Sequence, residues 1–262
     1  MYSGTIVPLI TPLAETGAVS EQSVQRLIDS IRHQVTGLMP TLSSGEGWKL
    51  SEQQWHDMVS YTVRHSAGLP VLAGIQLPTT EQVIARAETA VSLGVAAIAV
   101  TTPFAPGLAQ EEIYSHYRAL RAAVPIPLFI YNEEALSGNQ IALDTLLRIC
   151  RLPGVVGIKE SSGSAEFTRK LVAADLGIPV FEGWENLLHE VPGVAGFVGP
   201  LANLEPGLCN DMLAAPSMER QKAIDAACER YGLFRDDWYR SVKKELCRRR
   251  VIDTDATVED AR

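Results

Sequence analysis

The sequence predicts a (β/α)8 barrel, the TIM-barrel fold, followed by a C-terminal helical extension. About eight short apolar segments alternate with amphipathic segments at intervals of roughly 25–30 residues, the pattern of repeated β-α units around a parallel sheet. The chain has 262 residues, a length that suits one such barrel. No strand pattern follows Pro206, so we expect the barrel to span residues 1–205 and the extension residues 206–262.

The elements follow from hydrophobic periodicity and from turn and capping residues. Strands are expected at 4–10, 37–42, 71–75, 96–101, 127–132, 155–159, 179–183 and 195–198. Helices are expected at 21–33, 51–65, 80–93, 110–124, 141–151, 166–174 and 185–191, and in the extension at 218–231 and 236–249. Ser20 is a predicted N-cap, and Ser51 with Gln54 predicts a capping box.

A doubly wound open sheet is the competing architecture. That fold places a glycine-rich phosphate-binding turn after its first strand. The corresponding residues here are Thr11-Pro12-Leu13, which do not form such a turn. The closed barrel is therefore the preferred prediction.

Composition excludes several classes of function. The formal net charge of −8 argues against a general polyanion binder, so we expect no nucleic-acid partner. No apolar run is long enough to span a bilayer, and the first residues lack the pattern of a secretory signal, so we expect a cytoplasmic protein without a membrane partner.

Cysteine and histidine spacing predicts neither disulfides nor a metal site. The cysteines are widely separated and are expected to be reduced thiols: Cys150, Cys209, Cys228 and Cys247. The histidines lie in segments with helical patterns, without ligand spacing, and are expected at the surface: His33, His56, His65, His116 and His189. We expect no bound metal and no diffusible cofactor.

Lys159 is the first candidate catalytic residue. It follows the β-branched, apolar run Val155–Ile158 and precedes a Ser/Gly turn. Burial disfavours the ammonium form, and a partly neutral lysine amine attacks carbonyl groups to form a Schiff base. Two structural alternatives are that Lys159 extends past the strand end into solvent or pairs with Glu160.

In a (β/α)8 barrel the active site lies at the carboxyl ends of the strands, so polar residues there are the other candidates. Tyr131 ends a neighbouring strand, and its hydroxyl could transfer protons to and from the lysine adduct. Ser43 and Ser44 lie in a turn that could hold a carboxylate. Gly183 permits close approach of a ligand, and Glu185 could bind hydroxyl groups or act as a base. Val198 ends the last expected strand.

Each candidate also has a structural interpretation. Tyr131 could fill the barrel with its hydroxyl satisfied, and Ser43 and Ser44 could be ordinary turn residues. Glu185 could simply stabilise the N-terminus of its own helix through its negative charge. The functional interpretation gains weight because all of these groups fall at the same end of the barrel.

These residues resemble the dihydrodipicolinate synthase/N-acetylneuraminate lyase family of class I aldolases. The resemblance covers Gly4 to about Pro206. Its motifs, in order, are Ser43-Ser44-Gly45-Glu46 with Leu50-Ser51, Thr102-Pro103-Phe104, Tyr131-Asn132, Gly157-Ile158-Lys159-Glu160-Ser161-Ser162-Gly163, and Ala202-Asn203 with Pro206.

The resemblance implies a (β/α)8 barrel in which Lys159 forms a Schiff base with pyruvate or another 2-oxo acid. It implies Tyr131 as the proton-transfer residue and Ser43 and Ser44 as carboxylate binder and relay. It also implies a homo-oligomer, a dimer or a tetramer.

Two positions depart from the synthases of this family. Ala105 stands where the synthases carry a tyrosine that reaches the neighbouring subunit's site. Leu136 stands where they carry an arginine that binds the carboxylate of the aldehyde. A leucine cannot bind a carboxylate, and Glu133 and Glu134 would repel one. The loop around Ser137 is more similar to that of the sialic-acid lyases, and Glu185 lies near the position of their acid that binds sugar hydroxyls.

The sequence therefore predicts a Schiff-base lyase that joins pyruvate to an uncharged or hydroxylated aldehyde, or cleaves that bond. A 4-hydroxy-tetrahydrodipicolinate (dihydrodipicolinate) synthase and a dehydratase of 2-keto-3-deoxy sugar acids are alternatives within the same chemistry. A degenerate, non-catalytic 2-oxo-acid binder is the alternative from another class, and Ala105 motivates it.

Overall fold

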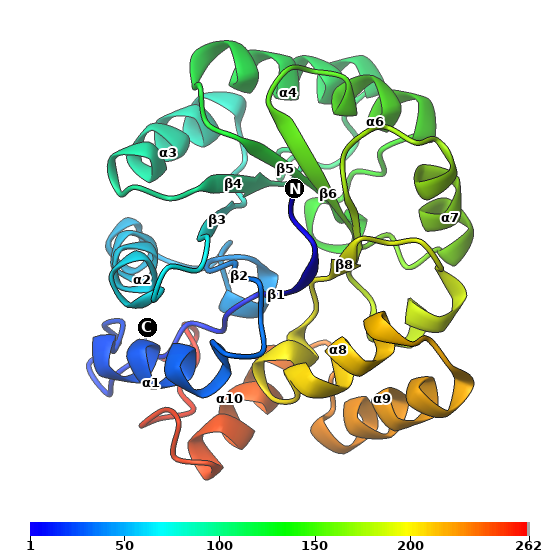
Figure 1. The fold of residues 1–262 in the computed structure, drawn as a ribbon. Coiled ribbons are helices and arrows are strands. Elements are labelled where there is room, and N and C mark those ends of the chain that lie inside the picture. Colours follow the sequence, from blue (N-terminus) through cyan, green and yellow to red (C-terminus); the bar gives the residue numbers. More distant parts are fainter. Residues whose placement is uncertain (261–262) are drawn as a thin grey trace.

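Eight parallel strands close into a barrel in the structure, a computed structural model that describes residues 1–260 (Figure 1). The strand order is β2-β1-β8-β7-β6-β5-β4-β3, and a parallel bridge between Leu38 and Val71 joins the two edges. The strands are β1 (Gly4–Val7), β2 (Gly37–Leu38), β3 (Leu72–Ile75), β4 (Ala97–Val100), β5 (Leu128–Asn132), β6 (Val155–Glu160), β7 (Val180–Glu182) and β8 (Gly196–Phe197). The predicted barrel is confirmed.

Every predicted strand is present, but most are shorter than the apolar run that predicted them. The largest difference is β2, which ends at Leu38 although the prediction extended to residue 42. Pro40 has no N–H to donate to a neighbouring strand, and Thr41 has a φ of 61°. The chain therefore leaves the sheet early and turns into the short 3-10 helix η1 (Ser43–Gly45).

Helices surround the barrel in the predicted alternation (Figure 1). They are α1 (Glu21–Ile31), α2 (Glu52–His65), α3 (Thr80–Ser92), α4 (Gln110–Ala123), α6 (Leu143–Cys150), α7 (Ala165–Ala173) and the 3-10 helices η2 (Glu185–Glu190) and η3 (Pro200–Asn203). The Ser20 side chain accepts the N–H of Ser23, and Ser51 with Gln54 forms the predicted capping box. These caps satisfy N–H groups that would lack partners in the first helical turn.

Two α-helices escaped the sequence prediction, as did the 3-10 helices η1 and η3. The first, α5 (Glu134–Ser137), is a single turn after β5 and is too short to show helical periodicity. The second, α8 (Pro206–Ala214), packs against β1 and β8 in the place of the eighth barrel helix. The domain boundary between residues 205 and 206 stays a prediction. Its position depends on whether α8 is counted with the barrel or with the extension.

Apolar side chains fill two layers. The barrel interior is packed with residues from several strands, among them Ile6, Phe129, Phe181 and Val198. A second layer lies between the strands and the surrounding helices. His116 belongs to this layer on α4 with its Nδ1 2.9 Å from Thr80 Oγ1, so its predicted surface position is wrong. Burial lowers the pKa of His116 to about 4, which keeps the ring neutral.

The extension is tied to the carboxyl end of the barrel through one buried ion pair. Lys243 of α10 (Trp238–Arg248) donates to Glu46, which follows η1, and both side chains are fully buried. Glu46 also accepts the N–H of Val258 at 2.8 Å, and Lys243 donates to the Ala256 carbonyl at 2.9 Å. The connection from α9 (Met218–Tyr231) to α10 therefore crosses the same end of the barrel as η1.

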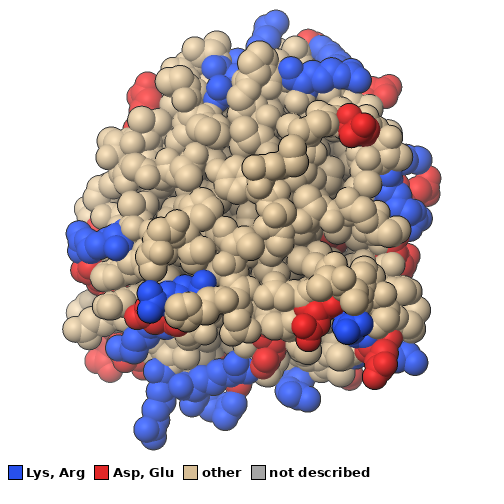
Figure 2. All heavy atoms as spheres, viewed as in Figure 1, with Lys and Arg blue, Asp and Glu red and all other residues tan. Residues whose placement is uncertain are grey.

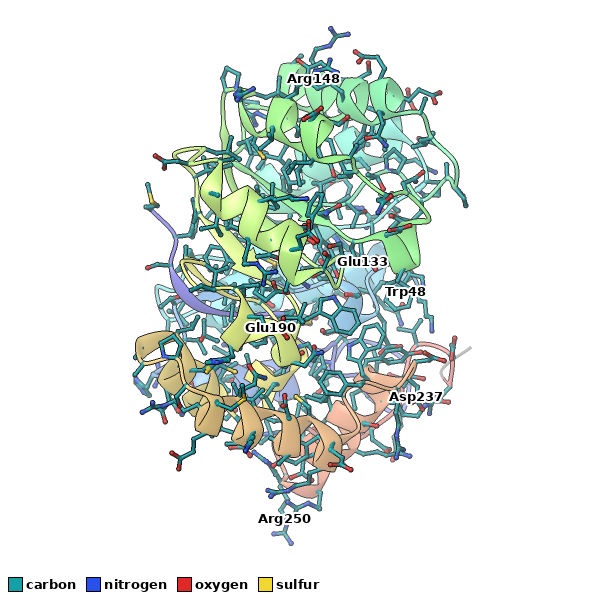
Figure 3. The ribbon with its side chains drawn as sticks, turned by 90° about the vertical axis from the view of Figure 1, so that its right-hand side faces the viewer. Trp48, Glu133, Arg148, Glu190, Asp237 and Arg250 are labelled. Atoms are coloured by element: carbon teal, nitrogen blue, oxygen red, sulfur yellow. The ribbon has the colours of Figure 1, made fainter. Side chains whose placement is uncertain are left out.

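The two ends of the barrel differ in their surroundings. Figure 2 shows the end at which the chain begins, where charged side chains gather mainly around the rim and the centre is uncharged. In Figure 3, turned by 90°, Glu133 and Asp237 lie on the opposite side from the N-terminal segment. Within residues 1–260, no helix combines the length and the apolar character needed to cross a membrane.

The buried pair predicts the effect of one substitution on stability. Lys243→Met leaves the Glu46 carboxylate buried without its cation, so the free energy of unfolding should fall by about 3–5 kcal/mol in urea denaturation. Lys170→Met is the matched control, because Lys170 is 55% exposed in its pair with Glu166 and should change stability by less than about 1 kcal/mol. Equal effects of the two substitutions would contradict the anchoring role of Lys243.

Candidate active site

The register of β5 and β6 brings two of the predicted residues together. Tyr131 and Lys159 are directly paired between these parallel strands, so their side chains share the inner face of the barrel. The Lys159 Nζ lies 4.1 Å from the centroid of the Tyr131 ring. The Tyr131 hydroxyl is 2.8 Å from the Ser43 Oγ, which η1 supplies from the other side.

The Lys159 amine is enclosed, with only 3% of the residue exposed. Burial lowers its pKa to about 8, although the negative charges of Glu133, Glu185 and Glu182 act in the opposite direction. A substantial fraction of the amine is therefore neutral near pH 7.5 and can attack a carbonyl group.

Neither structural alternative for Lys159 holds. The side chain does not reach solvent. Glu160 points to the other face of β6, as the alternation along a strand requires, and it accepts from Asn132 Nδ2 at 2.6 Å and from Ser162 N at 2.7 Å.

Two carboxylates face the amine. Glu133 caps the single turn α5 by accepting the N–H of Leu136, and burial raises its pKa. Glu185 begins η2, accepts the N–H of Leu201 at 2.9 Å, and has its pKa raised by burial to about 7. Among the described residues, no hydrogen bond from another side chain reaches either carboxylate. With a pKa of about 7, Glu185 can exchange protons with a bound molecule near neutral pH.

A cavity of about 410 Å³ opens over Lys159. Its lining includes six of the predicted site residues, Ser43, Ser44, Tyr131, Lys159, Gly183 and Glu185. The remaining lining residues are Glu133, Ala135, Leu136, Ser161, Trp184, Pro200, Leu233, Phe234, Arg235, Asp236 and Trp238.

Two of the predicted site residues lie outside this lining. The Ser137 hydroxyl donates to the Glu133 carbonyl and accepts the N–H of Asn139 at 3.3 Å, so it holds the loop around α5 together. Val198 is fully buried in the interior of the barrel.

Sequence reasoning missed several of the lining residues. Ser161 is two residues beyond Lys159, and strand alternation could have placed it on the same face. Its Oγ is buried within the lining of the cavity, where a bound molecule could reach it. No sequence pattern marks Trp184 as a lining residue. Residues 233–238 could not be predicted either, because only the docking of the extension brings them to the cavity.

The arrangement suits Schiff-base chemistry. A 2-oxo acid could condense with the Lys159 amine while its carboxylate meets the hydroxyls and backbone N–H groups around Ser43 and Ser44. Burial raises the pKa of Tyr131, so its phenol stays protonated and can donate to the oxygen that leaves as water. Among the described residues, no three His, Cys, Asp or Glu side chains are grouped so that they could hold a metal ion.

A (β/α)8 barrel with a buried lysine at the end of its sixth strand, beside a tyrosine from the fifth, defines the protein as a lyase of the class I aldolase type. The profile of the Dihydrodipicolinate synthetase family matches residues 1–230. The chain belongs to this family.

Individual relatives agree with this assignment. A 4-hydroxy-tetrahydrodipicolinate synthase from Thermomicrobium roseum is 34% identical over 221 residues, which cover 82% of this chain and 72% of the relative. The same enzyme from Rhodospirillum centenum is 32% identical over 217 residues, 81% of this chain and 74% of the relative.

Solved structures confirm the fold. Dihydrodipicolinate synthase from Acinetobacter baumannii, complexed with pyruvate, has a TM-score of 0.90 at 26% identity and covers 99% of this chain and 92% of its own. A 2-keto 3-deoxygluconate aldolase from Picrophilus torridus shares the fold with a TM-score of 0.82 at 23% identity, covering 94% of this chain and 93% of its own. The protein is thus a lyase of the class I aldolase type within this family.

The Tyr131 hydroxyl should matter for the rate of adduct formation. Tyr131→Phe keeps the ring beside the Lys159 amine but removes the proton donor, so imine formation with pyruvate should slow by about 10²–10⁴-fold. The rate is measured by trapping the imine with borohydride at successive times and determining the mass of the intact protein by mass spectrometry. Tyr117→Phe is the control, because Tyr117 is a buried tyrosine that donates to the Val100 carbonyl at 3.1 Å, outside the cavity. Equal rates for the two variants would exclude the assigned role.

The lowered pKa of Lys159 predicts a pH dependence for the same step. Below a pKa of about 8 the amine is mostly protonated, so the rate of imine formation should rise about tenfold per pH unit and level off above that pH. Rates measured from pH 5.5 to 10 test this. A rate that continued to rise up to pH 10 would indicate an ordinary, solvated lysine.

Proposed function

We propose that this lyase uses Lys159 to join pyruvate to an uncharged or hydroxylated aldehyde, or to cleave the 4-hydroxy-2-oxo acid that such a reaction forms. The observation that carries the proposal is that the Lys159 amine lies over the Tyr131 ring, whose hydroxyl is hydrogen-bonded to Ser43, in one cavity. An uncharged aldehyde is favoured because Leu136 stands in place of the arginine that would bind an aldehyde's carboxylate.

Each residue has a role in the reaction. The Lys159 amine adds to the 2-oxo carbon of pyruvate, and water leaves from the carbinolamine with a proton donated through Tyr131 and Ser43. Ser44 and the backbone of η1 hold the carboxylate. Loss of a proton from the methyl carbon of the imine gives an enamine.

The enamine carbon then attacks the aldehyde carbon, a carbon–carbon bond forms, and the aldehyde oxygen takes up a proton. Hydrolysis of the imine consumes one water and releases the product and the free amine. Glu185 and Gly183 lie where the aldehyde half would bind, and Glu185 can accept hydrogen bonds from its hydroxyl groups. Cleavage follows the same steps in reverse.

A true 4-hydroxy-tetrahydrodipicolinate synthase is the second candidate, because the relatives carry that name. The lining of the cavity argues against it. Leu136 cannot pair with the carboxylate of aspartate semialdehyde, and the Glu133 carboxylate would repel it.

The cytoplasmic location and the homo-oligomeric assembly also belong to this proposal. All four cysteines are free thiols in the structure, which suits a reducing compartment.

Trapping with borohydride tests the proposed function. Incubation with pyruvate and borohydride should add one reduced pyruvate to Lys159, as mass spectrometry of the intact and digested protein will show. Lys159→Ala should acquire no adduct. Turnover with pyruvate should be faster with glyceraldehyde than with aspartate semialdehyde, because only the latter carries a carboxylate.

The other outcomes identify the alternatives. No adduct on Lys159 would exclude Schiff-base chemistry. Faster turnover with aspartate semialdehyde would establish the synthase. An adduct without turnover of any aldehyde would identify a 2-oxo-acid binder, and loss of water from a 2-keto-3-deoxy sugar acid would identify the dehydratase.

A further inference from the structure

The lining of the cavity over Lys159 includes a set of apolar and aromatic side chains. Three segments supply it: the loop after β5, the start of η2, and the connection between α9 and α10. Their apolar lining residues are Ala135, Leu136, Trp184, Leu233, Phe234 and Trp238. A bound aldehyde would lie here, because Lys159 holds the pyruvate half at the floor.

Two of these aromatic side chains are unusually exposed. Trp184 is 37% exposed and Phe234 is 48% exposed. Among residues 1–260, only five large apolar side chains are exposed to this degree, and these two line the same cavity. Burying them against a ligand would be favourable, since aromatic rings bury large apolar areas and stack on one another.

Trp184 is held in a fixed orientation. Its indole N–H donates to the Ser161 carbonyl at 3.0 Å, two residues beyond Lys159. The indole ring lies close to Gly163, where the nearest ring atoms are 3.8 Å from the place a Cβ would occupy. A fixed indole loses little entropy when a flat ligand packs on it.

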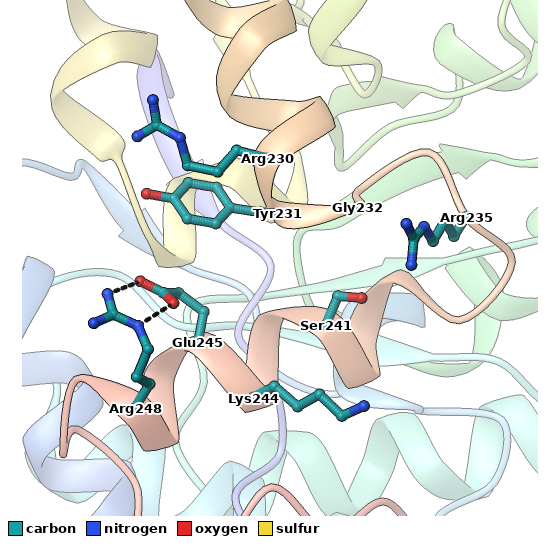
Figure 4. Close-up of a pocket in the computed structure, with 8 residues that line it drawn as sticks. All are labelled: Arg230, Tyr231, Gly232, Arg235, Ser241, Lys244, Glu245 and Arg248. Atoms are coloured by element: carbon teal, nitrogen blue, oxygen red, sulfur yellow. Dashed lines mark hydrogen bonds and ion pairs between the residues drawn. The ribbon is translucent and has the colours of Figure 1, made fainter.

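The remaining charges disfavour an anionic aldehyde. Glu133 and Asp236 are acidic members of the lining. Arg235 lines both this cavity and the groove between α9 and α10, where its Cδ and Nε lie 3.3 Å from the place a Cβ of Gly232 would occupy (Figure 4). Apart from Lys159, Arg235 is the only cation in the described lining, and the carboxylates of Glu133, Glu185 and Asp236 outnumber it.

The cavity has room for a ring. Its volume of about 410 Å³ falls within the range of roughly 300–1,000 Å³ found for pockets that enclose drug-sized ligands. A short polyol aldehyde would leave Trp184, Phe234 and Trp238 exposed, whereas an aryl group would cover them.

We propose that the aldehyde half of the substrate is aromatic, and that its ring packs on Trp184, Phe234 and Trp238. This inference depends on the proposed function. In the synthetic direction the enamine of pyruvate attacks an aryl aldehyde, one carbon–carbon bond forms, the aldehyde oxygen gains a proton, and hydrolysis releases a 4-aryl-4-hydroxy-2-oxo acid. In the cleavage direction the same bond breaks and the hydroxyl proton is lost.

Competition between uncharged aldehydes tests the inference. With saturating pyruvate, kcat/KM should be at least about tenfold higher for benzaldehyde than for glyceraldehyde. Phe234→Ala should raise KM for benzaldehyde by about fivefold and KM for glyceraldehyde by less, so that the preference between the two aldehydes falls. Met218→Ala is the matched control, because Met218 is 54% exposed on α9 and does not line the cavity.

Binding can be measured without turnover. Protein whose Lys159 has been capped by reduction with pyruvate cannot react with an aldehyde, so benzaldehyde should only bind and quench tryptophan fluorescence. Trp184→Phe should remove part of this quenching.

The failures of the two proposals are distinguishable. If no pyruvate adduct forms on wild-type Lys159, the proposed function fails. If the adduct forms but benzaldehyde is no better than glyceraldehyde, the aromatic inference alone is wrong. It is equally wrong if Phe234→Ala and Trp184→Phe change the oligomeric state in size-exclusion chromatography but not the preference between aldehydes, since the aromatic rim would then be a subunit interface.

Discussion

The burial of one amine beside one phenol is the constraint on which the rest of the site depends. Lys159 and Tyr131 are paired across β5 and β6, and both residues are buried inside the barrel. Desolvation makes the ammonium form costly, and the pKa of Lys159 falls to about 8 despite the surrounding carboxylates. The same geometry sets the ring of Tyr131, whose phenol is kept protonated by burial, 4.1 Å from the amine.

The C-terminal extension contributes to the site although it lies outside the strand pattern. Glu46 follows the serines of η1, and its buried pair with Lys243 links those serines to α10. The connection between α9 and α10 is consequently held over the mouth of the barrel, where it supplies Phe234 and Trp238. One ion pair therefore joins the serine-lined side of the cavity to the connection that supplies Phe234 and Trp238.

Much of the floor of this site could be predicted from the sequence. Lys159, Tyr131 and Ser43 each end an apolar run, and the barrel geometry brings the carboxyl ends of all strands together. Ser161 was also predictable in principle, because it lies two residues beyond Lys159 on the same strand face.

The lining residues that the extension supplies were not predictable in this way. Residues 233–238 reach the cavity through a contact between Glu46 and Lys243, which are 197 positions apart, and no local pattern encodes that contact. Ser137 could not be placed because the loop around it forms the single turn α5, in which its hydroxyl bonds to the backbone. His116 was misplaced because a polar residue on an otherwise apolar helix face looks like a surface residue until its partner, Thr80, is known.

The structure of crystals soaked with pyruvate tests the central claim most directly. The account predicts continuous electron density between the Lys159 Nζ and the second carbon of pyruvate, with the carboxylate against Ser43 and Ser44 and the Tyr131 hydroxyl within hydrogen-bonding distance of the adduct. Pyruvate bound elsewhere, or an unmodified Lys159 at saturating pyruvate, would contradict it.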